Sequence, residues 1–141
     1  MKTQLVRNWM TPNPITITPQ TTQPEAHHLM DEHKICRLPV VSKGNLVGIV
    51  TLGDIQKAQA SNAITLSVYE LNDMLDQLPA QKFMTYEPIT VASDSTIGEA
   101  AGLVVKYKIG ALPVIQDGEL VGIITEIDFC RLLMPQPEQG A

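Results

Sequence analysis

The stretch Leu38–Thr51, LPVVSKGNLVGIVT, returns 74 residues later as Leu112–Thr125, LPVIQDGELVGIIT. The likeness continues on both sides without insertion or deletion, so that residues 7–54 match residues 81–128 at 21 of 48 positions. Duplication at this level makes each copy one structural unit that is used twice. Two copies are too few for a solenoid. We therefore expect a pseudo-twofold pair whose halves bury each other, with a cleft between them as the first place to look for a site.

Length and composition are those of a globular protein. The chain has 141 residues, of which 44% are hydrophobic and 18% are charged, and both values are ordinary for folded domains. This length fits one compact domain or two small ones that pack closely. Each copy alone has a marginal size for a stable core, because small bodies bury a small fraction of their surface. Mutual burial of the copies would remove that difficulty.

Charge and cysteine content exclude several functions. The net charge is −5 with a pI near 5.0 and no Lys/Arg cluster, which argues against a nucleic-acid partner. No apolar run approaches the roughly 18 residues that span a bilayer, so we expect no membrane partner. Cys36 and Cys130 have no disulfide-framework spacing, and no signal peptide is evident. We expect a soluble cytoplasmic protein with reduced thiols.

Each copy shows the same order of predicted elements, strand–helix–strand–strand–helix. The fold class that this order predicts is α/β (α+β by some schemes), with two βαββα repeats packed as a pseudo-twofold intramolecular pair. Glycine and polar residues separate the two middle strands, as in a tight hairpin turn. In chain order the predicted features are strands at 14–17 and 88–91, capping boxes Thr22–Glu25 and Thr96–Glu99, hairpin turns Ser42–Asn45 and Gln116–Glu119, and second helices from Thr51 and Thr125.

A single segment, residues 58–80, separates the copies. We expect residues 62–67 to be extended and Val68–Leu78 to form a short helix with Val68, Leu71, Leu75 and Leu78 on one side. Its apolar content indicates that it packs on the body of the protein. The predicted domains are therefore a first repeat at 1–57, a linker at 58–80, a second repeat at 81–134 and a disordered tail at 135–141.

The pairs Thr51/Asp54 and Thr125/Asp128 carry the chemistry of the repeat. A threonine that ends a strand and begins a helix caps the helix, and the free N–H groups there suit a phosphate. A carboxylate three residues later can accept two hydrogen bonds, as a ribose diol offers. The same spacing is also simply a capping box with aspartate in the glutamate position. Both interpretations stay open at this point.

Taken together, these motifs give the sequence a family resemblance. Met-Thr-x-x-Pro-Ile-Thr at 10–16 and 84–90, the Leu-Pro-Val strands, and Gly-h-h-Thr-x-x-Asp (h, a hydrophobic residue) at the close of each repeat resemble a pair of CBS domains, the Bateman module. The resemblance covers residues 1 to about 134. Residues 65–72 are similar to the linker of acetoin-utilisation (AcuB-type) CBS proteins. Those proteins usually continue into an ACT domain, which this sequence lacks.

The resemblance implies a regulatory module that holds an adenine nucleotide (AMP, ADP or ATP, or a relative such as S-adenosylmethionine) in clefts built from both repeats. No metal cofactor is implied. Arg37 occupies a position where the family often contacts phosphate, whereas its counterpart is Ala111, so cleft one is predicted to be the better site. The implied residues are Thr11, Ile15, Ile35, Cys36, Arg37, Thr125 and Asp128 for cleft one, and Thr51, Asp54, Thr85, Ile89, Ile109, Gly110 and Ala111 for cleft two.

Other functions have less support in the sequence. His27, His28 and His33 lack the i, i+4 spacing of helical zinc ligands. Cys36 has no histidine at motif spacing, and no catalytic constellation is present, so we predict no enzyme. Cys130 is expected to be a small buried residue, and Met10 and Met84 to serve packing. The alternative function is a structural module with vestigial clefts. It would form a homodimer through the CBS helices around Ile55, Phe129, Leu132 and Leu133, or act on an unidentified effector protein.

Overall fold

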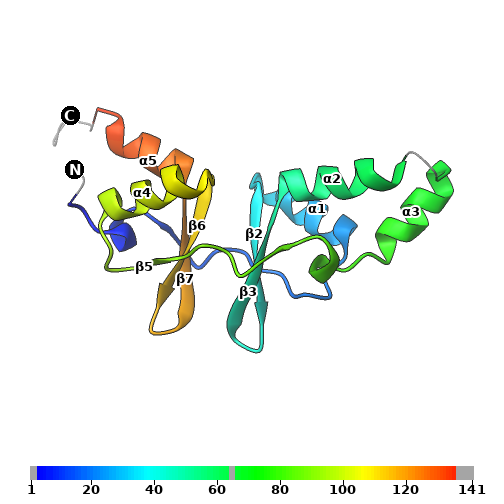
Figure 1. The fold of residues 1–141 in the computed structure, drawn as a ribbon, viewed down its shortest axis with the longest axis horizontal. Helices are drawn as coiled ribbons and strands as arrows, with labels where there is room; N and C mark the ends of the chain where they lie inside the picture. Colours follow the sequence, from blue (N-terminus) through cyan, green and yellow to red (C-terminus); the bar gives the residue numbers. More distant parts are fainter. Residues whose placement is uncertain (1–2, 64–65, 136–141) are drawn as a thin grey trace. The chain divides into compact units, whose positions relative to one another are not determined.

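A computed structural model describes residues 3–63 and 66–135, and it divides the chain into two compact units. The 14–88 unit consists of Pro14–Pro88, and the 89–141 unit combines Ile89–Ala141 with Met1–Asn13. Both contain strands and helices, so the predicted α/β class with two repeats is confirmed (Figure 1). The predicted disordered tail, apart from Pro135, and positions 64 and 65 of the linker lie outside the described residues.

Both units contain the same helix–strand–strand–helix series, with further elements before it in one unit and after it in the other. The elements of the 14–88 unit are α1 (Gln23–His33), β2 (Arg37–Ser42), β3 (Asn45–Thr51), α2 (Leu52–Ala63), α3 (Val68–Asp76), η2 (Ala80–Lys82) and β4 (Thr85–Tyr86). Those of the 89–141 unit are η1 (Val6–Asn8), β1 (Thr11–Pro12), β5 (Val91–Ala92), α4 (Ile97–Tyr107), β6 (Ala111–Gln116), β7 (Glu119–Thr125) and α5 (Glu126–Leu133).

An antiparallel hairpin is the centre of each unit, as predicted. In the first, Leu38 of β2 lies opposite Val50 of β3; in the second, Leu112 of β6 lies opposite Ile124 of β7. The turns are Lys43-Gly44 (φ 52° and 81°) and Asp117-Gly118 (φ 51° and 80°). Positive φ at both central residues is the geometry that matches strand twist in a two-residue hairpin, and glycine adopts it without cost.

The opening segment of each sequence repeat adds an edge strand to the hairpin of the other repeat. β1 pairs with β7, with Thr11 opposite Ile123, and β4 pairs with β3, with Thr85 opposite Ile49. The compact units therefore differ from the repeat boundaries predicted at 1–57 and 81–134. Those boundaries follow sequence likeness, whereas packing follows this exchange of segments.

Backbone hydrogen bonds fix the exchanged segments at equivalent points. In the 89–141 unit, Val6 N donates to Ser95 O at 2.9 Å and Ile97 N donates to Gln4 O at 2.7 Å. In the 14–88 unit, Ala80 N donates to Thr21 O at 2.7 Å and Gln23 N to Leu78 O at 2.9 Å. Each pair of bonds joins the segment before a Met-Thr motif to the loop that leads into the first helix of its unit.

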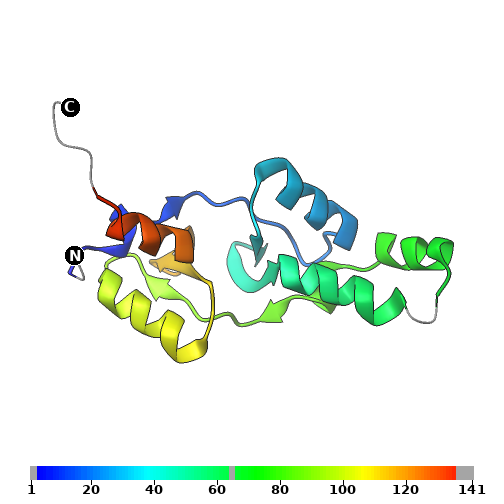
Figure 2. The same ribbon diagram turned by 90° about the horizontal axis from the view of Figure 1, so that it is seen from above.

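Two helices cover one side of each hairpin, and the core lies between them. α1 and α2 pack on β2 and β3, while α4 and α5 pack on β6 and β7 (Figures 1 and 2). The core of the 14–88 unit contains Ile17, Ala26, Met30, Leu38, Val40, Val50, Ile55, Ala80 and Met84. The core of the 89–141 unit contains Val6, Val91, Ile97, Ala100, Leu112, Val114, Ile124 and Leu132.

Two local predictions need correction. The first strand of each repeat is shorter than expected: Ile17 makes a single parallel bridge to Val40, and Val91–Ala92 form β5 beside β6. Thr96 caps α4 through a bond from Glu99 N to its Oγ1 at 3.1 Å, but Thr22 makes no such bond at α1. The two helix starts are otherwise alike, because Gln23 N and Ile97 N both donate to a carbonyl of the exchanged segment.

The linker forms a helix, with differences at its ends. α2 continues to Ala63, where the sequence indicated extended chain, and α3 packs on α1 and α2 as expected. Leu75 is buried against this surface, whereas Val68, which was assigned to the same apolar side, is exposed. The helix therefore contacts the unit through its C-terminal half.

We predict that Gly48→Ala destabilises the protein by about 1–3 kcal/mol, the range typical of overpacking. A Cβ at position 48 would lie 2.6 Å from Met84 Sδ and 2.9 Å from the backbone O of Thr85, so β4 would have to move. Urea unfolding followed by circular dichroism measures the loss.

Gly102→Ala is the matched control, because a Cβ at position 102 meets no atom within 4 Å in α4. It should raise stability by about 0.5–1 kcal/mol, the usual gain for alanine over glycine inside a helix. Equal effects of the two substitutions would contradict the close approach of β4 to Gly48.

Candidate functional site

The start of α2 places Asp54 beside the end of β3. Thr51 N donates to Asp54 Oδ2 at 2.9 Å, and Asp54 N donates to Thr51 Oγ1 at 3.1 Å. This reciprocal pair is a capping box, so the simpler interpretation of Thr-x-x-Asp is confirmed here. The box uses only one carboxylate oxygen. No described residue hydrogen-bonds Oδ1 of Asp54, which leaves that oxygen available to a ligand.

The start of α5 repeats the arrangement, but there both carboxylate oxygens of the aspartate have partners. Thr125 N donates to Asp128 Oδ2 at 2.9 Å, and Arg131 Nη1 lies 3.5 Å from Asp128 Oδ1. Asp128 is only 3% exposed, whereas Asp54 is half-buried. Both oxygens of Asp128 therefore have partners within the 89–141 unit. Arg131 is largely exposed, and an arginine there can turn away at little cost.

A pocket of about 390 Å³ opens beside Asp54 within the 14–88 unit. Four of its lining residues occupy one face of α2 at i, i+3, i+4 and i+7, and the other four are consecutive residues of the exchanged segment that ends in β4. The lining residues are Asp54, Lys57, Ala58, Ser61, Lys82, Phe83, Met84 and Thr85. The pocket therefore depends on the exchange of segments, because its second wall comes from the opening of the other sequence repeat.

The pocket combines one carboxylate with two lysines. Lys57 and Lys82 are exposed, and neither is within salt-bridge distance of an acidic residue in the described part of the chain. Hydroxyls of Ser61 and Thr85 add donors, and Phe83 and Met84 provide an apolar wall. Such a surface can hold a ligand with anionic, hydroxylated and flat apolar parts.

The predicted site residues divide between the two units. Of cleft two, Thr51, Asp54 and Thr85 belong to the 14–88 unit, and Ile89, Ile109, Gly110 and Ala111 to the 89–141 unit. Of cleft one, Thr11, Thr125 and Asp128 belong to the 89–141 unit, and Ile15, Ile35, Cys36 and Arg37 to the 14–88 unit. Each cleft as a whole, and the preference for cleft one, therefore stay predictions.

The sequence-based reasoning missed Lys57, Ser61, Lys82 and Phe83. Their signal was present, because Lys57 and Ser61 share a helix face with Asp54 at the spacing that places side chains together. Lys82 and Phe83 precede the Met-Thr motif that was already singled out. Only the exchange of segments, which the sequence did not indicate, brings these two groups to one pocket.

Arg37 lies opposite Thr51 in the β2–β3 ladder, and its counterpart Ala111 lies opposite Thr125. No carboxylate among the described residues is within 4.0 Å of the Arg37 guanidinium. The residue before Arg37 bonds to the first residue of α2, since Leu52 N donates to Cys36 O at 2.8 Å. Arg37 is thus half-exposed with its charge unpaired.

The structure also bears on the predictions for metal ligands, Cys130, the dimer face and the two methionines. No group of three His, Cys, Asp or Glu residues suitable for a metal occurs in the described ranges. Cys130 is exposed, so its assignment as a buried apolar residue was wrong. Ile55 and Leu132 belong to the cores, which removes both from the predicted dimer face, whereas Leu133 is exposed. Met84 is buried and Met10 packs against the other core, as expected for packing residues.

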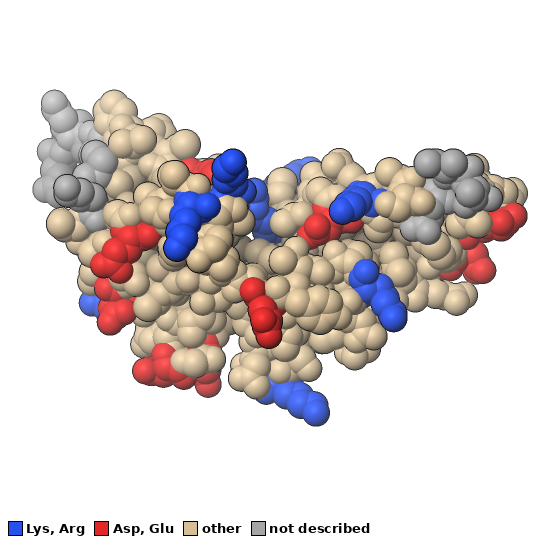
Figure 3. Space-filling model, viewed as in Figure 1, with Lys and Arg blue, Asp and Glu red and all other residues tan. Residues whose placement is uncertain are grey.

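The surface charges and the apolar length of the helices bear on possible nucleic-acid and membrane partners. Over the face of each unit drawn in Figure 3, Lys and Arg side chains stand among acidic and neutral residues and form no broad basic surface. Of the helices in the described part of the chain, none has the length and apolar character required to cross a membrane.

Comparison with known proteins identifies a domain type. The CBS domain family model matches residues 6–61 and 80–135. Inosine-5′-monophosphate dehydrogenase of Korarchaeum cryptofilum is 36% identical over 115 residues, and L-aspartate semialdehyde sulfurtransferase of Methanocaldococcus jannaschii is 34% identical over 130. These matches cover 81% and 91% of this chain but only 21% and 23% of those proteins. A CBS domain-containing protein of Dictyostelium discoideum is 33% identical, with 96% and 98% of the two chains covered.

Solved structures give the same result. The CBS domain pair of MJ0100, in complex with 5′-methylthioadenosine and S-adenosyl-L-methionine, has a TM-score of 0.78 at 32% identity and covers 92% of this chain and 95% of its own. CBSX2 in complex with AMP has a TM-score of 0.77 at 28% identity, with 92% and 96% covered. The putative acetoin utilization protein AcuB from Vibrio cholerae has a TM-score of 0.77 at 32% identity, with 92% and 89% covered.

We predict that Thr51→Ala lowers the free energy of unfolding by about 1 kcal/mol, as expected when a helix loses its N-cap hydroxyl. Thr51→Ser keeps the hydroxyl and should lose much less. Chemical denaturation of the two variants beside the unmodified chain measures the difference. Equal losses would show that the hydroxyl bond from Asp54 N does not stabilise α2.

Proposed function

Because this chain belongs to the CBS domain family, we propose that it is a regulatory module that binds an adenine nucleotide or a related adenosyl ligand, and that it is not itself an enzyme. The observation that carries the proposal is the pocket beside Asp54, where a free carboxylate oxygen and two unpaired lysines meet. The complexes of related CBS pairs with AMP, 5′-methylthioadenosine and S-adenosyl-L-methionine support the ligand class.

Each part of a nucleotide has a complementary group in the pocket. Oδ1 of Asp54 would accept a hydrogen bond from a ribose hydroxyl, since Oδ2 is occupied by the capping box. Lys57 and Lys82 would face the phosphates as point charges, with the hydroxyls of Ser61 and Thr85 as further donors. Phe83 offers an apolar surface to the base. AMP, ADP and ATP all present these three parts, and ATP or ADP would use the two lysines more fully.

Ligand binding would stabilise the pairing of β4 with β3. The ligand would contact α2 of the first repeat and residues 82–85, which open the second repeat, at the same time. A ligand that binds only the arrangement with β4 in place stabilises that arrangement by mass action. This gives a route from nucleotide concentration to the conformation of the chain. The receiver would be an effector protein or a second copy of the chain, and the cytoplasm, where such nucleotides are abundant, is the proposed location.

Cleft one remains part of the proposal. Arg37 has no acidic partner within the described residues, so its guanidinium is available to a phosphate. Asp128 would have to exchange its contact with Arg131 for a ribose hydroxyl, and the 3.5 Å separation indicates a weak contact. We therefore propose that both clefts accept adenosine ligands, with the Asp54 pocket favouring those that carry more phosphates.

We predict that ATP binds the chain and that Asp54→Ala weakens binding about tenfold, the effect of losing one hydrogen bond to a charged group. Lys57→Gln and Lys82→Gln should each weaken the binding of ATP more than the binding of adenosine. 2′-Deoxy-ATP should bind the unmodified chain more weakly than ATP, and this difference should shrink in Asp54→Ala. Isothermal titration calorimetry measures all four effects.

Lys106→Gln is the matched control, because Lys106 is exposed on α4 in the other unit and lies outside the pocket. It should leave ATP affinity unchanged. The proposal fails if ATP, ADP and AMP do not bind at millimolar concentration, or if Lys106→Gln weakens ATP as much as Lys57→Gln does.

A structural role through self-association is the second candidate, and one observation favours it. Ile127 at the start of α5, and Leu133 and Met134 at its end, are 63%, 70% and 61% exposed. Large apolar side chains grouped on a surface helix are typical of a protein interface. A homodimer that uses this surface would explain them without any ligand.

We predict that sedimentation velocity detects a dimer and that Leu133→Glu shifts the chain toward the monomer. Burying an unpaired carboxylate in an apolar interface is costly, so the dissociation constant should rise about tenfold or more. Val68→Glu, on an exposed residue of α3 in the other unit, is the control and should have no effect. A monomer at every concentration would exclude this candidate.

A further inference from the structure

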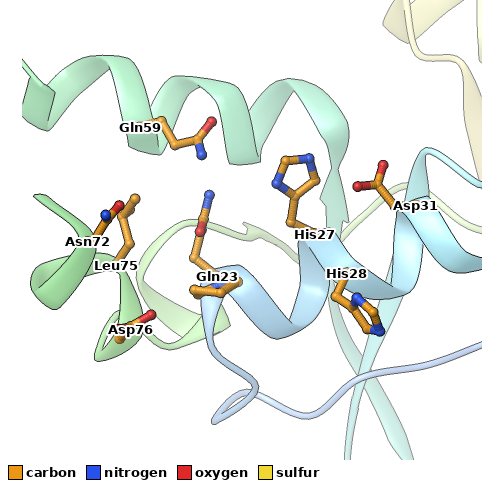
Figure 4. Close-up of a pocket in the computed structure, with 9 residues that line it drawn as sticks. Gln23, His27, His28, Asp31, Gln59, Asn72, Leu75 and Asp76 are labelled. Atoms are coloured by element: carbon orange, nitrogen blue, oxygen red, sulfur yellow. The ribbon is translucent and has the colours of Figure 1, made fainter. Parts of the chain in front are cut away.

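A second pocket lies within the 14–88 unit, beneath the linker helix. It encloses about 500 Å³ between α1, α2 and α3, and it shares no lining residue with the pocket beside Asp54. Its polar lining residues are Gln23, His27, His28 and Asp31 of α1, Gln59 of α2, and Asn72 and Asp76 of α3. Figure 4 shows the side-chain amides of Gln23 and Gln59 pointing toward one another across this space.

Gln23 is the unusual residue of this pocket. Its side chain is 2% exposed, and Nε2 has no hydrogen-bond partner among the described residues. Burying an amide without a partner costs free energy, and native structures rarely tolerate it without a reason. An acceptor that enters the pocket would satisfy the donor in this position.

The second sequence repeat shows that the fold does not require this polarity. The position equivalent to Gln23 is Ile97, which is equally buried at 5% exposure. Likewise His27, Asp31 and Gln59 correspond to Ala101, Val105 and Leu133, which are all apolar. The polar set therefore occurs only where α3, which has no counterpart in the other unit, forms the third wall.

The chemistry of the lining restricts the occupant. The carboxylates of Asp31 and Asp76 line the pocket beside the imidazoles of His27 and His28, and no Lys or Arg does, so a cation is favoured over an anion. A metal ion lacks the three His, Cys, Asp or Glu ligands it would need in the described residues. Leu75 and Pro24 alone offer an apolar surface, which is too little for a hydrophobic ligand. Gln23 Nε2 requires an acceptor oxygen, and the two carboxylates favour one that carries no negative charge.

We propose that the pocket beneath α3 binds a small organic ammonium compound that also carries an acceptor oxygen, such as an amino alcohol. The ammonium group pairs with Asp76 or Asp31, and the oxygen accepts from Gln23 Nε2. Gln59 and Asn72 supply further amide contacts. This site gives the module a second input, on the linker helix, that is separate from the nucleotide pocket.

The test uses ω-amino alcohols of increasing length, each with the alkylamine and the diol of the same length. Nuclear magnetic resonance of the full chain reports the side-chain NH2 groups of Gln23, Gln59 and Asn72 directly, and calorimetry gives affinities. An amino alcohol should shift these three signals and bind about five- to tenfold more tightly than its matched alkylamine, since it makes one more hydrogen bond.

Gln23→Ile copies the second repeat and separates ligand binding from folding. It should raise the melting temperature by roughly 3 °C, because it removes an unpaired buried donor, and it should abolish the preference for the amino alcohol over the alkylamine. Asp76→Asn, on the exposed end of α3, should remove the preference for the amino alcohol over the diol. Asp54→Asn, in the nucleotide pocket, should change neither.

Three results would overturn the proposal. The first is the absence of any shift in the three amide signals with every probe, which would mean that only water satisfies Gln23. The second is a lower melting temperature for Gln23→Ile, which would assign the amide a structural role. The third is unchanged amino-alcohol affinity in both Gln23→Ile and Asp76→Asn.

Discussion

The backbone pairing of each repeat's opening segment with the other repeat's hairpin is the constraint on which the structure depends. β4 lies so close to β3 that position 48 must be glycine, and β1 imposes the same demand on Gly122, where a Cβ would lie 2.9 Å from the backbone O of Thr11. Neither hairpin is complete without the exchanged strand. Each compact unit of the duplicated chain therefore contains residues of both copies, and the pocket beside Asp54 takes one wall from each copy.

The Thr-x-x-Asp motif shows how one residue can serve the fold and the site together. In both repeats the aspartate closes a capping box through Oδ2, which fixes its side chain at the start of a helix. A carboxylate held in this way loses little entropy when its second oxygen meets a ligand. The capping and ligand-binding interpretations of the motif, which are alternatives from the sequence, are therefore compatible in the structure. The repeats differ at the second oxygen: Arg131 pairs with Oδ1 of Asp128, whereas no described residue forms a hydrogen bond or ion pair with Oδ1 of Asp54.

The sequence predicted the parts of the fold that depend on local pattern. Hairpins, turns and helices follow from apolar periodicity and from the Lys43-Gly44 and Asp117-Gly118 turns, which need few tertiary contacts to be recognised. It did not predict the exchange of segments, since β1 and β4 have two residues each and no periodicity to read. For the same reason Lys82 and Phe83 were missed at the site, although Asp54 was found.

Native mass spectrometry of the chain in the presence of ATP tests the central claim most directly, since it counts bound nucleotides per chain. The account predicts at least one ATP on each chain, with an affinity that is unchanged when Asp128 is replaced by alanine and about tenfold weaker when Asp54 is replaced. A spectrum that shows only the bare chain at millimolar ATP, or bound ATP that persists without Asp54 and disappears without Asp128, would contradict the assignment of the pocket beside Asp54.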